Sequence, residues 1–186
     1  MLNLLIFGMH VLIVGGTGML KAVTEHHIRP GNIVSLVARN GEKLEGLKAS
    51  SSQPAKVNVI AQDYTETDAA INRVEKIIED AGQVDLAILW IHSTGNAFRL
   101  KLKELLINTN KDVKIFELAG SAAIDHAALN NDDQDRKYSA NYRKIILGHA
   151  YTNDQFRWLT HEEICEGTLH ALENDKPLHI VGTLSG

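Results

Sequence analysis

The chain has 186 residues, of which 44% are hydrophobic and 23% are charged. This length is sufficient for one domain with its own core, and the ordinary charge content excludes a disordered tail. The net charge of −4 comes without clusters of Lys and Arg, and the mean hydropathy is −0.13, so we expect neither nucleic-acid binding nor a membrane bundle.

Residues 1–14, MLNLLIFGMHVLIV, carry no formal charge. A secretory signal would need a basic region and a small-residue cleavage site, and a membrane span needs about 20 apolar residues. We interpret residues 1–8 as an N-terminal extension, either upstream of a natural start at Met9 or native and packed on a neighbour. Residues 9–186 then form one domain. The single cysteine, Cys165, cannot form an internal disulfide, which favours a cytoplasmic location.

Apolar runs alternate along the chain with segments of helical spacing. The predicted strands are residues 11–14, 33–38, 57–61, 85–91, 113–118, 144–149 and 179–181. The predicted helices are residues 17–28, 41–47, 67–81, 97–109 and 160–173. Residues 130–141 are polar and are expected to form an exposed loop. The alternation predicts an α/β fold, a Rossmann-type doubly wound parallel sheet with helices on both faces, in a single domain.

A glycine-rich turn follows the first predicted strand and opens the first predicted helix. A nucleotide pyrophosphate needs backbone N–H groups at a helix N-terminus and no side chain that blocks its approach. Gly15 allows a tight turn and Gly18 lets the backbone come close to phosphates. We therefore expect the pyrophosphate to lie along Gly15, Thr17, Gly18 and Met19. A turn without a ligand is the alternative.

Residues 11–39, together with Asp63 after the third strand, resemble the short-chain dehydrogenase/reductase family. The resemblance is to its atypical or extended branch, whose turn reads Gly-x-x-Gly-x-x-Gly. Gly15 and Gly18 match the first two glycines, and Lys21 stands at the third, where its amine could reach a phosphate. The resemblance covers residues 11–121. It implies an oxidoreductase that uses a nicotinamide dinucleotide and acts on a small carbonyl or alcohol.

The end of the second strand decides the choice of cofactor. An acidic residue there would accept hydrogen bonds from the ribose 2′-hydroxyl and favour NAD. The chain has Ala38-Arg39-Asn40 instead, and a guanidinium can hold a 2′-phosphate through charge-assisted hydrogen bonds. Arg39 therefore favours NADP over NAD. A surface Arg that opens the next helix is the alternative, and Glu42 is an acidic candidate nearby.

Further cofactor contacts are implied by the resemblance. Asp63, followed by Tyr64, matches the acidic position that faces the adenine amino group, although an Asp that ends a strand is also a common turn former. After its fourth strand the family carries Asn-Asn-Ala-Gly beside the nicotinamide ribose. This chain has Trp-Ile-His-Ser-Thr-Gly at residues 90–95, and the location predicts that Trp90, His92 and Ser93 contact the cofactor.

The catalytic residues of the family match this chain only in part. The family uses a Tyr with a Lys four residues later and a Ser at the fifth strand. Ser121 stands where that Ser would be, but the chain contains no Tyr-x-x-x-Lys, so we expect the long catalytic helix to be shortened or missing. Ser121 is the predicted proton donor, with Tyr142 or His92 as a second group. Tyr138 and His126 are weaker candidates.

The absent Tyr–Lys pair also supports another class of function. The chain could be a non-catalytic sensor or regulator that binds NAD(P) and has lost the reaction. In either case the predicted partners are a nicotinamide dinucleotide, a small molecule for the enzyme, and further copies of the chain, paired through the helix at residues 97–109.

A metal site is not expected. His161 and Cys165 have the spacing of two ligands on one helix face. The better-supported interpretation is structural, because Thr160-x-x-Glu163 is a capping box. His161 then occupies the first helical turn, and Cys165 lies on the buried side.

Overall fold

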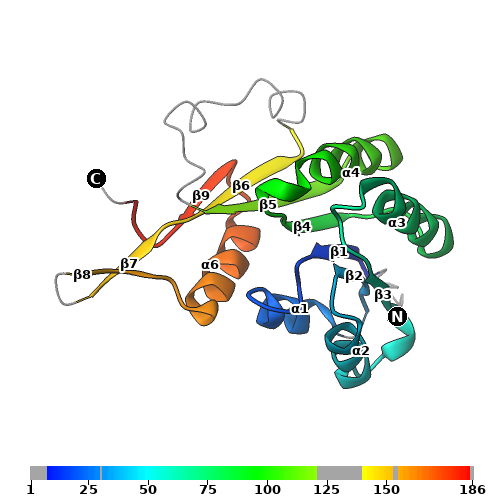
Figure 1. Ribbon diagram of the computed structural model, residues 1–186, viewed down its shortest axis with the longest axis horizontal. Helices are drawn as coiled ribbons and strands as arrows, with labels where there is room; N and C mark the ends of the chain where they lie inside the picture. Colours follow the sequence, from blue (N-terminus) through cyan, green and yellow to red (C-terminus); the bar gives the residue numbers. More distant parts are fainter. Residues whose placement is uncertain (1–7, 30, 121–139, 153–154, 185–186) are drawn as a thin grey trace, which may run out of the picture.

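The structure is a computed structural model that describes residues 8–29, 31–120, 140–152 and 155–184. Its centre is a seven-stranded sheet with the order β3-β2-β1-β4-β5-β6-β9 (Figure 1), in which every pairing is parallel. The strands are β1 (His10–Val14), β2 (Ile33–Ala38), β3 (Val57–Ala61), β4 (Leu86–Trp90), β5 (Lys114–Gly120), β6 (Tyr142–Leu147) and β9 (Leu178–Val181). The sequence-based prediction of a doubly wound parallel sheet is confirmed.

Helices cover both faces of the sheet. They are α1 (Lys21–His27), α2 (Gly41–Ser50), α3 (Thr67–Ala81), α4 (Asn96–Thr109) and α6 (His161–Asn174), with short 3-10 turns η1 (Pro54–Lys56) and η2 (Ser93–Gly95). Figure 1 shows α3 and α4 on one face and α1, α2 and α6 on the other. Within the part of the chain that the structure describes, no helix is long and apolar enough to cross a membrane.

Both faces of the sheet are buried, which explains the unbroken apolar strands. In β1, Val11 and Ile13 pack into the core under α1 and α6, whereas Leu12 and Val14 pack into the core under α3 and α4. All four side chains are at most 1% exposed. A strand between two helical layers needs apolar residues at every position, so the sequence pattern was sufficient to identify it.

The helix after the glycine turn begins at Lys21, and the prediction that it begins at Thr17 was wrong. The chain makes a series of turns over residues 16–20 before the helix starts. These turns are held by Thr24, whose buried hydroxyl donates to the carbonyl of Gly16 at 2.9 Å. The longer loop leaves more backbone outside the helix at the carboxyl ends of the strands.

The chain after β6 also differs from the prediction. The strand ends at Leu147, and the chain continues into a two-stranded hairpin of β7 (His149–Thr152) and β8 (Gln155–Trp158). The hairpin extends away from the sheet (Figure 1). Its large side chains are exposed, with Phe156 at 55% and Trp158 at 64%. Because neither strand buries one face in the main core, the sequence carries no strong strand pattern here.

Candidate functional site

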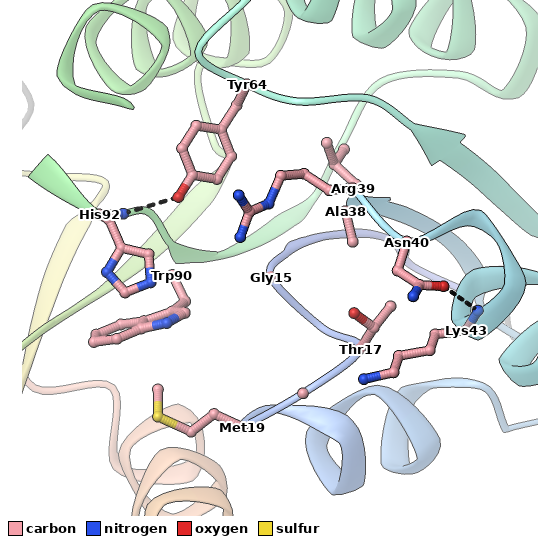
Figure 2. Close-up of a pocket in the computed structure, with 12 residues that line it drawn as sticks. Gly15, Thr17, Met19, Ala38, Arg39, Asn40, Lys43, Tyr64, Trp90 and His92 are labelled. Carbon is pink, nitrogen blue, oxygen red and sulfur yellow. Dashed lines mark hydrogen bonds between the residues drawn. The ribbon is translucent and has the colours of Figure 1, made fainter. Parts of the chain in front are cut away.

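A pocket of about 300 Å³ opens at the carboxyl ends of β1, β2 and β4 (Figure 2). The sheet order reverses between β1 and β4, and ligands of doubly wound sheets bind at such a reversal. The lining residues come from the glycine turn, the end of β2, the start of α2 and the loops after β3 and β4. They are Gly15, Thr17, Gly18, Met19, Val37, Ala38, Arg39, Asn40, Lys43, Tyr64, Trp90 and His92.

Most of the residues predicted to contact a cofactor are therefore brought together. Gly15, Thr17, Gly18, Met19, Arg39, Tyr64, Trp90 and His92 line one pocket. Asp63 and Ser93 do not line it. Asp63 lies in the turn after β3, and Ser93 begins η2 beside the pocket residue His92.

The glycine turn is shaped for close approach. Gly15 has a φ of +82°, a conformation that L side chains rarely adopt, and a Cβ there would lie 2.9 Å from the carbonyl oxygen of Trp90. At Gly18, by contrast, a Cβ would find no atom within 4 Å. The turn is thus closed against β4 at Gly15 and open at Gly18, where a phosphate can approach the backbone.

Two cations face the pocket from the β2–α2 connection. The guanidinium of Arg39 points into it between Tyr64 and Gly15 (Figure 2), and its Nη1 lies 3.9 Å from Oδ2 of Asp63. The Arg39 side chain is 74% exposed, so this ion pair is weak. The ammonium of Lys43 lies on the side of the pocket near Thr17 (Figure 2). A phosphate between these cations would be held from two sides.

Local sequence explains why Lys43 lies there. Asn40 is the N-cap of α2, and its Oδ1 accepts a hydrogen bond from the Lys43 N–H at 2.9 Å. The cap places Lys43 in the first helical turn, close to Arg39. Our sequence analysis missed Lys43, although an Asn cap followed three residues later by a Lys was a visible signal. Lys21, the amine considered earlier, pairs instead with Glu25 at 3.4 Å.

Asp63 has a structural role in the turn after β3. Its Oδ1 accepts hydrogen bonds from the N–H and the hydroxyl of Thr65, at 2.9 and 2.8 Å. These bonds, assisted by the charge of Arg39, hold the pKa of Asp63 below its usual value. Asp63 therefore acts as a turn former, the alternative that its position at the end of a strand suggested. Its contact with a cofactor stays a prediction.

Aromatic side chains form the far wall of the pocket. The Tyr64 hydroxyl accepts a hydrogen bond from the His92 N–H at 3.3 Å (Figure 2). The Tyr64 ring stacks on Phe98 of α4, with ring centroids 5.9 Å apart. Trp90 and His92 meet edge to face at 5.1 Å. The loop after β4 is therefore held against the loop after β3 by the Tyr64–His92 hydrogen bond, and Tyr64 is fixed in turn by its stacking on α4.

Of the predicted catalytic residues that the structure describes, His92 lines this pocket and Tyr142 lies away from it. Ser121, His126 and Tyr138 lie outside the described residues. Tyr142 is the first residue of β6 and pairs with Ile115 near the start of β5. It therefore lies at the amino edge of the sheet, opposite to the pocket. Its ring is buried, and its hydroxyl donates to Oε2 of Glu117 at 3.1 Å.

Tyr142 belongs to a buried ionic cluster that the sequence did not predict. Lys103 of α4 is fully buried, and its Nζ lies 2.5 Å from Oε2 of Glu117 and 4.1 Å from the Tyr142 ring centroid. Arg99 contacts Oε1 of Glu117 at 2.9 Å. Burial alone would raise the pKa of Glu117, but Lys103 and then Arg99 lower it below its usual value. The cluster ties α4 to β5.

The capping box at the start of α6 is confirmed. The Thr160 hydroxyl accepts from the Glu163 N–H at 3.2 Å, and Glu163 accepts from the Thr160 N–H at 2.8 Å. Cys165 is buried, and its Sγ donates to the carbonyl of Met19 at 3.0 Å. Helix α6 thereby contacts the loop that lines the pocket. Among the described residues, no group of three His, Cys, Asp or Glu could hold a metal ion.

Comparisons with known proteins agree with this fold. No protein-family model and no curated protein matches the chain. Among solved structures, one described as a 3-oxoacyl-reductase from Bacillus thuringiensis has a TM-score of 0.72 at 15% identity, covering 97% of this chain and 99% of that one. A short chain dehydrogenase from Bacillus anthracis has a TM-score of 0.69 at 17% identity, covering 95% and 96%.

A third similar structure contains a bound dinucleotide. It is an NAD+-bound xylitol dehydrogenase, with a TM-score of 0.58 at 18% identity over 79% of this chain and 73% of that one. At such identities the comparisons establish the architecture. The chain has the fold of the short-chain dehydrogenases/reductases, as its resemblance in sequence led us to expect.

Proposed function

We propose that the pocket binds NADP(H) and that the protein is an oxidoreductase acting on a small carbonyl or alcohol. The observation that carries the proposal is the placement of Arg39 and Lys43 beside the open glycine turn. Two cations next to a phosphate-sized opening favour a cofactor with an additional phosphate. Among the described residues that line the pocket there is no Asp or Glu, which an NAD ribose would use as its acceptor.

The residues around the pocket suit successive parts of such a cofactor. The pyrophosphate would lie along Gly15 to Met19, where the opening at Gly18 admits it. The 2′-phosphate would lie between Arg39 and Lys43. Arg39 would exchange its weak pair with Asp63 for a stronger charge-assisted bond. The nicotinamide would lie toward Trp90 and His92, at the carboxyl end of β4.

The bound nicotinamide would supply or accept the hydride, and the chain must then move a proton to or from the substrate oxygen. We propose Ser121 for this role because it follows Gly120, the last residue of β5, whose carboxyl end adjoins that of β4. His92 lines the pocket and is the second candidate. Loss of turnover with unchanged cofactor binding in Ser121→Ala would support the assignment. Unchanged turnover would exclude Ser121 as the proton donor.

The decisive experiment compares NADPH and NADH binding in the protein freed of nucleotide and in Arg39→Ala. Trp90 lines the pocket, whereas Trp158 is 64% exposed on the hairpin, so a Trp158→Phe background reports on Trp90 fluorescence alone. We expect NADPH to bind more tightly than NADH and to lose about tenfold or more in Arg39→Ala. NADH binding should hardly change. Arg29→Ala, an exposed Arg outside the pocket, is the matched control.

Two results would contradict the proposal. Equal affinity for NADPH and NADH, with no effect of Arg39→Ala, would remove the 2′-phosphate site. Absence of binding for both nucleotides would remove the cofactor and with it the oxidoreductase reaction. Each result can be told from misfolding by the circular dichroism spectrum and the thermal midpoint of the same samples.

A second candidate function is a non-catalytic NAD(P) sensor. It is favoured by the position of Tyr142, which is hydrogen-bonded to Glu117 at the edge of the sheet away from the pocket. The chain also contains no Tyr-x-x-x-Lys. Tight NADPH binding without NADPH oxidation across a broad panel of aldehydes and ketones would favour the sensor. Oxidation that depends on one class of substrate would exclude it.

A further inference from the structure

A second cavity lies at the opposite edge of the sheet from the dinucleotide pocket. Its volume is about 350 Å³, within the range of small-molecule sites. The walls come from the amino ends of β4 and β5, from the end of α1 and from the last turns of α6. Its apolar lining among the described residues is Met9, Leu86, Phe116, Leu169 and Leu172.

The rim of this cavity is acidic. Three carboxylates line it, those of Asp85, Asp112 and Glu173. The single Lys in the described lining, Lys114, has its Nζ 2.5 Å from Oδ2 of Asp175, a carboxylate that Arg143 also contacts, so the lining holds three carboxylates against one ammonium. The electrostatic balance of the lining is therefore negative, and it favours a positively charged ligand.

A buried histidine adds a directional polar group. His27, at the end of α1, lines the cavity and is 6% exposed. Its Nε2 is buried and has no hydrogen-bond partner among the described residues. Burial lowers the pKa of His27 to about 4, so the ring is neutral at pH 7, and with the proton on Nδ1 its Nε2 accepts a hydrogen bond. Buried polar atoms of this kind usually have a partner.

We propose that this amino-edge cavity binds a small organic cation with an apolar body, of the arylalkyl ammonium class. The leucine and phenylalanine walls take the apolar body. An ammonium group offers only donors, and the rim carboxylates are the acceptors that suit it. The site is separate from the dinucleotide pocket, and the proposal does not depend on what that pocket binds.

The test uses the full chain and 2-phenylethylammonium as the probe, followed by calorimetric titration and by ¹H–¹⁵N chemical shifts. 2-Phenylethanol is the neutral probe of similar shape. We expect saturable binding of the cation, shift changes centred on His27 and Leu172, and weaker binding of the alcohol. NADPH should not displace the cation.

Two kinds of variant locate the site. Asp112→Asn combined with Glu173→Gln removes two exposed rim charges, and we expect it to weaken the cation about tenfold. Glu75→Gln combined with Glu79→Gln, on the exposed side of α3, is the matched control and should change nothing. Leu172→Trp fills the cavity and should abolish binding; the rim variant keeps the test valid if this one fails to fold.

Several outcomes would overturn the proposal. They are the absence of saturable binding of the cation, equal binding of the alcohol, full affinity in the rim variant, and displacement by NADPH. Concentration-dependent self-association that excludes the probe, detected by sedimentation, would also overturn it, because the cavity would then be closed by a second copy.

Discussion

The fully buried ammonium of Lys103 and the carboxylate of Glu117 lie 2.5 Å apart between α4 and β5. Arg99 contacts the other carboxylate oxygen at 2.9 Å, and the Tyr142 hydroxyl also donates to Glu117. Glu117 thus contacts two cations, one of which is fully buried. Removing one member of a buried ion pair is costly, because the remaining charge loses a partner that it cannot replace with water.

We expect Glu117→Gln to destabilise the protein by about 3 kcal/mol, because it removes the charge of a carboxylate that contacts a buried ammonium. Urea unfolding measures this change. The control is Asp68→Asn, which breaks the surface pair of Asp68 with Lys101, 2.7 Å long with side chains 84% and 56% exposed. That variant should lose less than about 1 kcal/mol. Equal losses in the two variants would contradict the role of burial.

The same cluster gives a pH dependence of stability. The folded-state pKa of Glu117 lies below its unfolded value, which is near 4.5. Its stabilising contribution is therefore complete above that value and is lost as the pH falls through the folded-state pKa. Unfolding free energies of the wild type and Glu117→Gln, measured from pH 7 to pH 3, should converge toward acid. A constant difference would contradict the prediction.

Two glycine substitutions test the backbone strain at Gly15, with Gly46 in α2 as the unstrained comparison. Gly15→Ala places a side chain at φ +82° and against the Trp90 carbonyl, so we expect a loss of about 1–2 kcal/mol. Gly46→Ala, in the middle of α2 with no atom within 4 Å of the new Cβ, should gain about 0.5–1 kcal/mol. Thermal and urea unfolding of both variants check the signs. A neutral Gly15→Ala would contradict the strain.

Gly18→Ala tests the proposed phosphate path without disturbing the fold. Its new Cβ meets no atom within 4 Å in the protein itself, so the unfolding free energy should change by less than about 0.5 kcal/mol. NADPH and NADH should both bind more weakly, because the methyl group occupies space that the pyrophosphate needs. Unchanged affinity for both nucleotides would show that the phosphates do not pass this residue.

If the 2′-phosphate lies beside Lys43 as proposed, Lys43→Ala should weaken NADPH binding about tenfold and leave NADH binding unchanged. Lys48→Ala, a half-buried Lys farther along α2 that does not line the pocket, is the control. The titration used for Arg39→Ala provides the measurement. A similar loss for NADH would place Lys43 at the pyrophosphate instead.

The start of α6 offers a local test. Thr160→Ala removes the hydroxyl that accepts a hydrogen bond from the Glu163 N–H, and we expect it to lower the free energy of unfolding by about 1 kcal/mol.

The hydrogen bonds from Arg157 and then from the Thr160 N–H lower the pKa of Glu163 to about 2. The contribution of ionised Glu163 to the stability of the folded protein is present above about pH 4.5 and is lost as the pH falls toward 2. His161→Ala, which leaves the cap intact, is the control in unfolding measurements.

Local sequence was sufficient for most of the elements and for much of the pocket lining. The apolar strands β2 and β3 and the amphipathic helix α3 have the predicted bounds, because burial on both faces or on one stripe imposes a period that the sequence displays. The glycine turn and Arg39 were also found from sequence. In a parallel sheet the carboxyl ends of the strands share one edge, so residues that directly follow strands are brought together.

Tertiary structure decided what depends on packing between distant segments. Lys103 has helical spacing but no feature that distinguishes it from a solvated Lys. The packing of α4 against β5 and β6 buries it beside Glu117 and Tyr142. Tyr142 was a candidate proton donor until strand register placed it at the amino edge of β6. The amino-edge cavity joins β4, β5, α1 and α6, which are far apart in the chain. Sequence period thus determines which residues are buried, and strand order and register determine what they meet.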